Sequence, residues 1–403
     1  MSRHRMLLAS ATGAGATAAA FALLYAVVWV PGLVVLAVAV LVGAAAGRSL
    51  GLTTRTAALC PVATAALLAP QVVAPTDLVQ VLVLGIAALG LQVLLGTSGQ
   101  LSLAQGTMLG LGGYTTAVLV TDHGWPALAT LPVAVVVTGA VGWLLGGVAA
   151  RFDGVYLVIL TGAFAIVVPI LLKYFEGLTG GVQGISVWLP ESPTPLLGDD
   201  EYLYLLVLAA TAVAAGLTWN VTRGSVGLAL RALHDSPVAA RGVGINLRRA
   251  KMQAFLVSAL LAGLAGGLYA LSVGFVSPDS FGLLLGIHLL VMVVLGGSGS
   301  MAGAFLGAGA VHLLQVHLRE IAIPVGGGHE VPLGPQAVFG LVLVLVLLLA
   351  PSGLAGLPER MRTLVADGRR GHRAGRLDDR PSRSVVETAN PPMHDATREG
   401  EAG

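Results

Sequence analysis

The segment RGSVGLALRALHDSPVAARGVGINLRRAK, from Arg223 to Lys251, is basic and amphipathic and lies between two strongly apolar runs. Its residues Val226, Leu230 and Leu233 are spaced at i, i+4 and i+7, which places them on one face of a helix. Arg231 falls away from that face, so one side of the helix can be buried while the other stays in water. The pattern predicts an amphipathic helix held just under a lipid bilayer.

A second short helix is predicted to begin at Pro237, because proline suits the first helical turn. Asp235 or Ser236 can cap this helix, and Gly242 and Gly244 permit a tight exit from it. The whole segment therefore resembles a docking element built as helix, turn, helix, turn. Its charge alone is equally consistent with an ordinary loop that only orients the neighbouring membrane spans.

The composition is that of a multi-spanning membrane protein. Of the 403 residues, 56% are hydrophobic and only 10% are charged, and the mean hydropathy is +0.86. A soluble domain carries about 25% charged residues. The 55 glycines and the 5% aromatic residues suit helices that approach closely in lipid through small side chains.

We predict an all-α polytopic fold with about 10 to 12 transmembrane or half-membrane helices. Several candidate runs are shorter than the roughly 20 residues of a full crossing, and Pro169 interrupts another, so some spans are expected to be tilted, broken or re-entrant. The apolar runs end at Val30 and Ala46 in the N-terminal region and then cover residues 57–75, 78–96, 106–121, 127–150, 155–172, 203–220, 252–274, 282–296, 301–318 and 335–350.

The basic residues indicate how these runs alternate across the membrane. If the N-terminus is cytoplasmic, alternation places every Lys and Arg except Lys173 and Arg319 on the cytoplasmic side. We therefore expect a multi-pass protein of the plasma membrane with both termini in the cytoplasm. The outer connection 173–202 is expected to meet a solute-carrying protein or to be a plain linker.

Several function classes are excluded by what the sequence lacks. No Gly-Lys dipeptide occurs, so there is no phosphate-binding P-loop, and energy from ATP must come from a partner. Cys60 is the only cysteine, which excludes an intrachain disulfide and a thiolate metal cluster. His312 and His317 are five residues apart without a third ligand, so we predict no metal site. The net charge of +2 does not favour nucleic acid as a partner.

The stretch GTSGQLSLAQG, from Gly96 to Gly106, interrupts an apolar region with small and amide residues. Backbone that leaves a helix at membrane depth must be buried in protein or line a cavity, where its N–H and C=O groups can bind a zwitterion. The alternative is a short turn at the cytoplasmic side.

Two further features have a functional and a plain interpretation. His288 lies inside an apolar run, where it is either a functional group or a packing histidine that is hydrogen-bonded. Leu95–Gly99 and Leu295–Gly299 share the pattern L-G-x-S-G, which is either the trace of a parallel internal repeat or chance in a chain rich in glycine.

Three stretches carry a resemblance to a known family. They are LALRALHDSPVAARGVGINLRRAKMQAFLVSALLAGLAGGLYA, LGLQVLLGTSGQLSLAQGTMLGLGGYTTAVL, and Arg151 to Tyr156 running on to Thr161 and Phe164. The second resembles the signature G-Q-x-S-L-G-H-A-x-F-x-G-x-G-A-Y, and the third R-x-x-G-x-Y…T-x-A-F. Together they resemble the permease subunits of bacterial branched-chain amino acid ABC importers, the M-type subunit in particular.

The chain departs from the family pattern at a few positions. Gln105 and Gln92 stand where His and Asn are usual, and His288 stands where Glu is common. Val238, preceded by Pro237, stands where an acidic residue is usual. These changes leave the permease function in place and bear on the choice of substrate.

The resemblance implies an importer permease for leucine, isoleucine or valine, with no enzymatic activity and no cofactor of its own. It implies a second permease subunit, two ATP-binding subunits that hold ATP and magnesium, an extracytoplasmic solute-binding protein, and contact with membrane lipid. The alternatives are an importer of the same family for urea, short amides or other amino acids, and an ion-driven secondary transporter. The implied organisation is N-terminal transmembrane helices in 1–75, a permease core in 76–351 with a cytoplasmic coupling loop at 221–251, and a disordered cytoplasmic tail in 352–403.

The resemblance also implies two groups of functional residues. Coupling to the ATPase is expected from Arg223, Gly227, Arg231, Asp235, Ala239, Ala240, Gly244 and Ile245. The translocation path is expected to include Gln92, Gly99, Gln100, Ser102, Gln105, Tyr114, Thr161 and His288.

Overall fold

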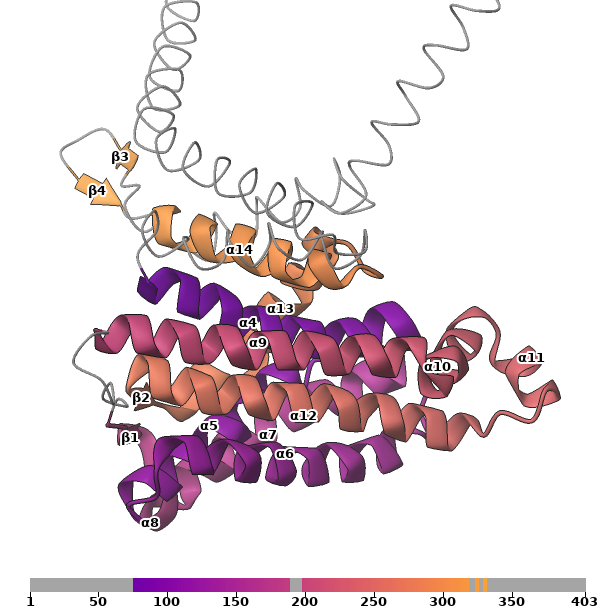
Figure 1. Cartoon of the computed structure of the whole chain (residues 1–403), viewed down its shortest axis with the longest axis horizontal. Helices are drawn as coiled ribbons and strands as arrows, with labels where there is room; N and C mark the ends of the chain where they lie inside the picture. Colours follow the sequence, from indigo (N-terminus) through magenta and orange to yellow (C-terminus); the bar gives the residue numbers. More distant parts are fainter. Residues whose placement is uncertain (1–74, 189–197, 319–322, 326–328, 332–403) are drawn as a thin grey trace, which may run out of the picture. The chain divides into compact units, whose positions relative to one another are not determined.

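The computed structural model describes residues 75–188, 198–318, 323–325 and 329–331. The predicted spans before residue 75, the predicted span at 335–350 and the predicted tail 352–403 therefore lie outside the described residues. The described part is mainly α-helical, in agreement with the predicted all-α membrane fold. Its main feature is a bundle of long helices (Figure 1).

Every apolar run predicted between residues 78 and 318 is a helix in the structure. In chain order the helices are α4 (Pro75–Gln92) continued by the π-helical turn η2 (Val93–Thr97), α5 (Gln105–Thr121), α6 (Ala127–Ala149), α7 (Val155–Tyr174), α8 (Glu176–Thr179), the 3₁₀ turn η3 (Gly181–Gln183), α9 (Asp199–Arg223), α10 (Ser225–Asp235), α11 (Pro237–Gly242), α12 (Leu247–Val273), the 3₁₀ turn η4 (Pro278–Phe281), α13 (Leu283–Gly296) and α14 (Met301–Leu318).

Five helical segments of the described part are long and apolar enough to cross a membrane: α4 with η2, α6, α7, α9 and α12. α13 and α14 qualify together as a sixth span, but they meet at a bend of 119°. α13 has only 14 residues, and α5 has 17. The expectation that run 282–296 is part of a broken or re-entrant span agrees with this bend.

Two short antiparallel strand pairs were not predicted. β1 (Ile185–Ser186) pairs with β2 (Phe275–Val276), and β3 (Ile323–Val325) pairs with β4 (His329–Val331). Strands of two or three residues are too short for an alternating pattern to be recognised. The first pair fastens the loop after α8 to the end of α12.

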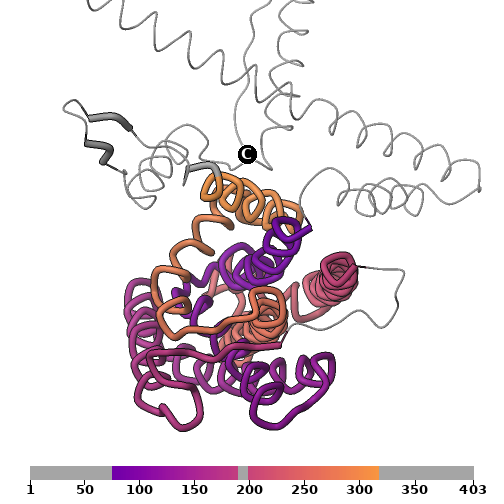
Figure 2. Tube along the Cα trace, turned by 90° about the vertical axis from the view of Figure 1, so that its left-hand side faces the viewer, coloured from indigo at the N-terminus to yellow at the C-terminus, as the bar shows by residue number. Residues whose placement is uncertain are grey.

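α12 is the central helix, and it packs against α6, α5 and α4. In Figure 2, α12 lies within the bundle and α9 lies at its edge. Glycines let α12 approach α5 at backbone distance: a Cβ on Gly112 would lie 2.5 Å from the carbonyl oxygen of Gly263. A Cβ on Gly266 would overlap the carbonyl oxygen of Leu109. In lipid the hydrophobic effect does not favour contact between helices, so close packing through small residues stabilises their association instead.

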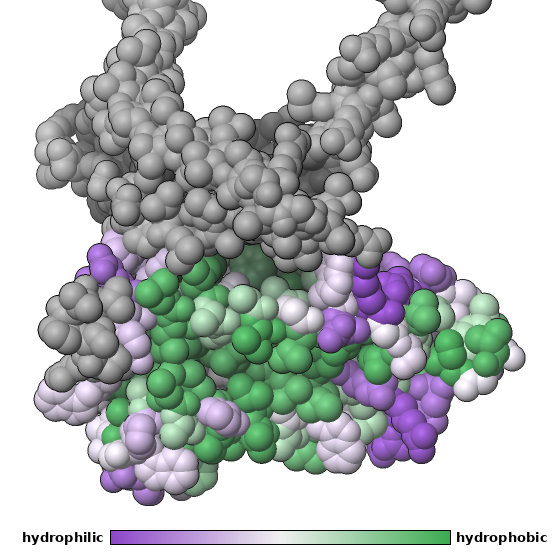
Figure 3. Space-filling model, viewed as in Figure 1, coloured by the Kyte–Doolittle hydropathy of each residue, from purple (hydrophilic) through white to green (hydrophobic). Residues whose placement is uncertain are grey.

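The flanks of the bundle are apolar and exposed. Side chains such as Val136 on α6, Ile159 on α7 and Val213 on α9 are about 60% exposed or more. Figure 3 shows hydrophobic side chains covering the middle of one face, with hydrophilic side chains gathered toward its ends. This distribution suits a bundle surrounded by lipid or by other membrane subunits.

Charges separate between the two ends of the bundle. The end that carries α10 and α11 also holds Arg151, where α6 meets α7, and Lys251, near the start of α12. The opposite end holds acidic residues, including Asp122 after α5 and Glu176 on α8. Lys173 is paired there with Asp279 at 2.5 Å. Because basic residues gather on the cytoplasmic side of membrane proteins, this distribution of charges predicts that the α10–α11 end is cytoplasmic.

Candidate functional site

The interruption predicted at Gly96–Gly106 is present as a break between η2 and α5. Gly99 has a φ of +69°, a left-handed conformation that favours glycine. The break is closed by local hydrogen bonds: Ser98 Oγ donates to Leu94 O at 2.7 Å, and Gln100 Nε2 donates to Ser98 Oγ at 2.9 Å. Both side chains are buried. Among the described residues the Gln100 Oε1 atom has no hydrogen-bond partner.

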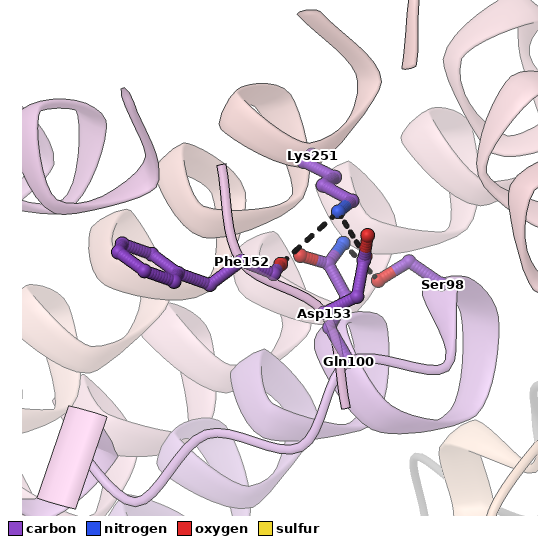
Figure 4. A network of polar contacts seen from close by, with 5 residues as sticks. All are labelled: Ser98, Gln100, Phe152, Asp153 and Lys251. Atoms are coloured by element: carbon purple, nitrogen blue, oxygen red, sulfur yellow. Dashed lines mark hydrogen bonds and ion pairs between the residues drawn. The ribbon is translucent and has the colours of Figure 1, made fainter. Parts of the chain in front are cut away.

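A buried ammonium group lies beside this break (Figure 4). Lys251 forms an ion pair with Asp153, in the turn between α6 and α7, and donates to the carbonyl oxygen of Phe152 at 3.2 Å. The Lys251 side chain is 7% exposed, whereas the Asp153 side chain is 84% exposed. One end of the pair is therefore in protein and the other in solvent, and the pair joins α12 to the α6–α7 turn.

These groups line a pocket of 470 Å³ at the α10–α11 end. Its lining includes Gln100, Asp153 and Lys251 together with His234 from α10 and Pro237 from α11. Gly99 faces the imidazole of His234 so closely that a Cβ there would overlap Nδ1. The pocket thus brings the break between η2 and α5 into direct contact with the amphipathic segment.

The amphipathic segment has the predicted helix–turn–helix form, which we call the α10–α11 hairpin (residues 225–242). Leu230 and Leu233 are buried, as their spacing predicted. Ser236 is the cap of α11, since its Oγ accepts a hydrogen bond from Ala239 N at 3.3 Å. Asn246 caps α12 in the same way, accepting from Arg249 N at 3.1 Å.

The predicted coupling residues occupy different positions on and around this hairpin. Gly227 packs α10 onto the end of α9, because a Cβ there would overlap the carbonyl oxygen of Thr222. Ala240 is buried and accepts from Ile245 N at 3.0 Å, whereas Ala239 is exposed. Gly244 has a φ of +83° and ends the exit turn. Arg223, Arg231 and Asp235 are exposed.

Gln92 lies at a second contact of the same end. In the amide orientation that satisfies its surroundings, its oxygen accepts hydrogen bonds from Ser300 N, at 3.0 Å, and from Gly299 N. The two L-G-x-S-G stretches therefore lie side by side, with Gly96 against Gly299. Gln92 joins the end of α4 to the bend between α13 and α14.

Gln105 and Ser102 lie deeper in the core than the pocket. Gln105 accepts from Ser258 Oγ at 2.7 Å and donates to Ala87 O at 3.0 Å, so it links α5 to α12 and α4. Both residues line a cavity of 10 Å³, which is too small for a solute. In this structure Gln105 holds helices together, whereas Ser102 Oγ accepts a local hydrogen bond from Ala104 N at 3.3 Å.

The remaining predicted path residues are separate from the pocket. Thr161 Oγ1 accepts from Leu103 N at 3.1 Å and fastens the break to α7. Tyr114 is buried toward the opposite end, where its ring meets Phe281 edge to face at 6.2 Å. His288 lies half-buried on α13. Of the predicted path residues, Gly99 and Gln100 therefore line the same pocket, and the other six lie elsewhere in the bundle.

The sequence allowed Asp153 to be interpreted as an interface anchor, but it did not indicate the Lys251–Asp153 pair or a role for His234. A lysine near the start of an apolar helix was the available signal, since the chain has only two lysines. The contact of His234 with Gly99 had no local signal, because its partners are far apart in the chain. Among the described residues no group of His, Cys, Asp and Glu could hold a metal ion.

Residues 76–351 match the family model described as branched-chain amino acid transport system, permease component. That range covers more than half of the chain, including the break, the ion pair and the hairpin. The chain belongs to this permease family. It is accordingly a multi-pass membrane protein and a transport component rather than an enzyme.

Individual relatives agree with the family model. The high-affinity branched-chain amino acid transport system permease protein LivM of Escherichia coli (strain K12) is 33% identical over 297 residues, covering 67% of each chain. The corresponding protein LivH of the same strain is 26% identical over 290 residues, covering 68% of this chain and 91% of LivH. The autoinducer 2 import system permease protein LsrC of Enterobacter sp. (strain 638) is 32% identical over 142 residues, covering 34% of this chain and 38% of LsrC.

No solved structure matches this chain. The arrangement of break, ion pair and hairpin is therefore read from this chain's own geometry.

Proposed function

We propose that this chain is the M-type permease subunit of an importer that carries leucine, isoleucine and valine into the cell at the expense of ATP. Two separate subunits bind ATP and magnesium and hydrolyse the nucleotide. A second permease subunit completes the pathway, and an extracytoplasmic solute-binding protein delivers the amino acid. The relatives named LivM and LivH support a multi-subunit system of this kind.

The observation that carries the proposal is the apolar tip of the α10–α11 hairpin. Val238 is 80% exposed, and Val243, which directly follows the hairpin, is 77% exposed. Figure 3 shows hydrophobic side chains beside hydrophilic ones at this end of the bundle. Large apolar side chains that project into water beside charged ones are typical of a protein interface. An ATPase subunit docked on this tip removes them from water.

The inner face of the same hairpin supports a route for the ATPase movement. Leu230 and Leu233 anchor α10 in the core, and His234 presses on Gly99 at the break. The chain leaving the hairpin enters α12, whose Lys251 binds the α6–α7 turn. A displacement of the tip is thereby transmitted to two sides of the pocket at once.

The charge separation supports a cytoplasmic position for the hairpin and for both termini. The ATP-binding subunits then meet the chain at the α10–α11 end. The solute-binding protein approaches the other end, where α8 and the β1–β2 pair lie.

An ion-driven carrier is the alternative, and the distribution of charges counts against it. Within the described helices, Asp and Glu occur only at helix ends, as with Asp77 on α4 and the acidic start of α9. A carrier driven by protons or sodium ions is expected to hold ionisable groups inside its spans. His288 is the main candidate that the described part offers.

The proposal that the substrates are branched-chain amino acids is based on the names of the relatives. LsrC is named for a different solute, so a related sequence does not by itself decide the substrate. Urea, short amides and other amino acids therefore belong in the substrate panel of the test.

Reconstitution in proteoliposomes tests the proposal. The full set, with ATP on the hairpin side and loaded binding protein on the other, is expected to accumulate leucine, isoleucine and valine. The same set with a non-hydrolysable nucleotide is expected to accumulate none. Accumulation by this subunit alone under a proton or sodium gradient would contradict the proposal, and accumulation of urea or amides alone would reassign the substrate.

A further inference from the structure

A second pocket, with a volume of 410 Å³, lies at the α10–α11 end and is distinct from the one at the break. It lies between the last turns of α9, the start of α14 and α10. Its lining consists of Gln92, Val93, Thr97, Thr218, Trp219, Thr222, Arg223, Arg231, Gly299, Ser300, Met301 and Ala302. We call it the arginine pocket.

The charge of the arginine pocket is one-sided. Two guanidinium groups, those of Arg223 and Arg231, face a lining that contains no Asp or Glu. Neither arginine forms an ion pair with a carboxylate of the described part, where the ion pairs are those of Lys173, Lys251 and His312. The first residues of α14 add the partial positive charge of a helix N-terminus. The pocket therefore attracts an anion.

The position of the pocket defines the kind of anion. Arg223 lies over the ring of Trp219, with its Cζ atom 3.6 Å from the ring centroid. Tryptophan and arginine at the end of a span mark the level of lipid headgroups. The lining of the pocket also contains Met301, and the Trp219 side chain is 49% exposed. An occupant at this site meets positive charge at its head and apolar surface beside it.

We propose that the arginine pocket binds the phosphate of an anionic phospholipid, such as phosphatidylglycerol, from the leaflet on the hairpin side. Arginine suits this role because its planar donors match phosphate oxygens. Basic pockets between membrane helices are known to bind anionic headgroups in this way. A free phosphate ion offers the same oxygens, but it cannot use the apolar side chains of Trp219 and Met301.

Such a lipid bridges two moving parts of the proposed importer. Arg231 belongs to α10 of the hairpin, whereas Ser300 belongs to the bend between α13 and α14, which Gln92 also holds. A bound headgroup fixes the distance between them. This regulatory role rests on the proposed function, whereas the binding itself does not.

Lipid binding to the purified full-length subunit in neutral detergent tests the site. Native mass spectrometry and thermal unfolding are measured with phosphatidylglycerol, with phosphatidylcholine and with inorganic phosphate. Wild type is expected to bind and be stabilised by phosphatidylglycerol alone. Because each basic group near the surface contributes about 1 kcal/mol, the double variant Arg223→Gln/Arg231→Gln is expected to bind phosphatidylglycerol tenfold more weakly or worse.

Two matched variants separate the pocket from general charge and from misfolding. Arg248→Gln/Arg249→Gln removes two exposed arginines outside the pocket, and it is expected to keep wild-type binding. Arg223→Lys/Arg231→Lys keeps the charge and is expected to keep most of the binding. Equal loss in the Arg248/Arg249 variant, unchanged binding in the Arg223/Arg231 glutamine variant, or stabilisation by inorganic phosphate without phosphatidylglycerol would overturn the proposal. Because no transport is measured, failure here leaves the importer function open, and failed uptake leaves the lipid site open.

Discussion

Lys251, the fifth residue of α12, donates its ammonium protons to Asp153 and to the carbonyl oxygen of Phe152, both in the turn between α6 and α7. The lysine is buried and the aspartate is largely exposed. The link therefore fastens the central helix to a turn at the bundle surface, directly where the chain leaves the α10–α11 hairpin.

Removing Asp153 and removing Lys251 are expected to lower the stability of the protein by different amounts. Asp153→Asn removes the negative charge that pairs with the buried ammonium of Lys251, so we expect a loss of about 1–2 kcal/mol in stability. Lys251→Met removes the charge and keeps the apolar stem, so we expect a smaller loss. Thermal unfolding in detergent measures both. A larger loss in Lys251→Met than in Asp153→Asn would argue against the buried charge as the cause.

Gly99→Ala tests the contact between the break and the hairpin. An alanine at a φ of +69° costs about 1 kcal/mol, and its Cβ displaces the ring of His234. We expect reduced uptake by the reconstituted importer, partly restored when His234→Ala makes room. A double-mutant cycle on uptake measures this interaction. If the two changes simply add, the contact does not transmit the movement.

Thiol labelling distinguishes residues of the pocket from residues of the core. In a Cys60→Ala background, a cysteine replacing Gln100 lines the pocket of 470 Å³ and is expected to react with small water-soluble reagents. A cysteine replacing Gln105 or Ser102 borders only a cavity of 10 Å³ and is expected to stay inert. Equal reactivity at Gln100 and Gln105 would place the water-filled path deeper than this structure does.

Gly266→Ala tests the close packing of α12 on α5. Its added methyl group overlaps the carbonyl oxygen of Leu109, so we expect a loss of about 1–3 kcal/mol in stability. Gly216→Ala on α9 is the matched control, because a Cβ there meets nothing within 4 Å. That control is expected to be neutral or stabilising by up to about 1 kcal/mol. Similar melting temperatures for the two variants would show that α5 and α12 tolerate separation.

The helices and the hairpin could be predicted because their signals are local. Ser236, Pro237 and the spacing of Leu230 and Leu233 are enough to define α10 and α11. The contacts that form the site are not local: His234 with Gly99, Lys251 with Asp153, and Gln92 with Ser300 join distant parts of the chain. Gln105 shows most clearly what the sequence alone does not decide. An amide side chain near a helix break is equally consistent with a residue that lines the translocation path and with one that joins helices in the core.

The coupling ratio of the reconstituted importer tests the central claim most directly. In Val238→Glu, docking of the ATPase subunit buries an unpaired carboxylate, which is costly away from water. We expect the amount of leucine taken up per ATP hydrolysed to fall about tenfold or more. Ser225→Glu adds the same charge at the exposed start of α10, away from the apolar tip, and is expected to keep the wild-type ratio. An unchanged ratio in Val238→Glu, with normal amounts of inserted protein, would contradict the assignment of the hairpin as the coupling element.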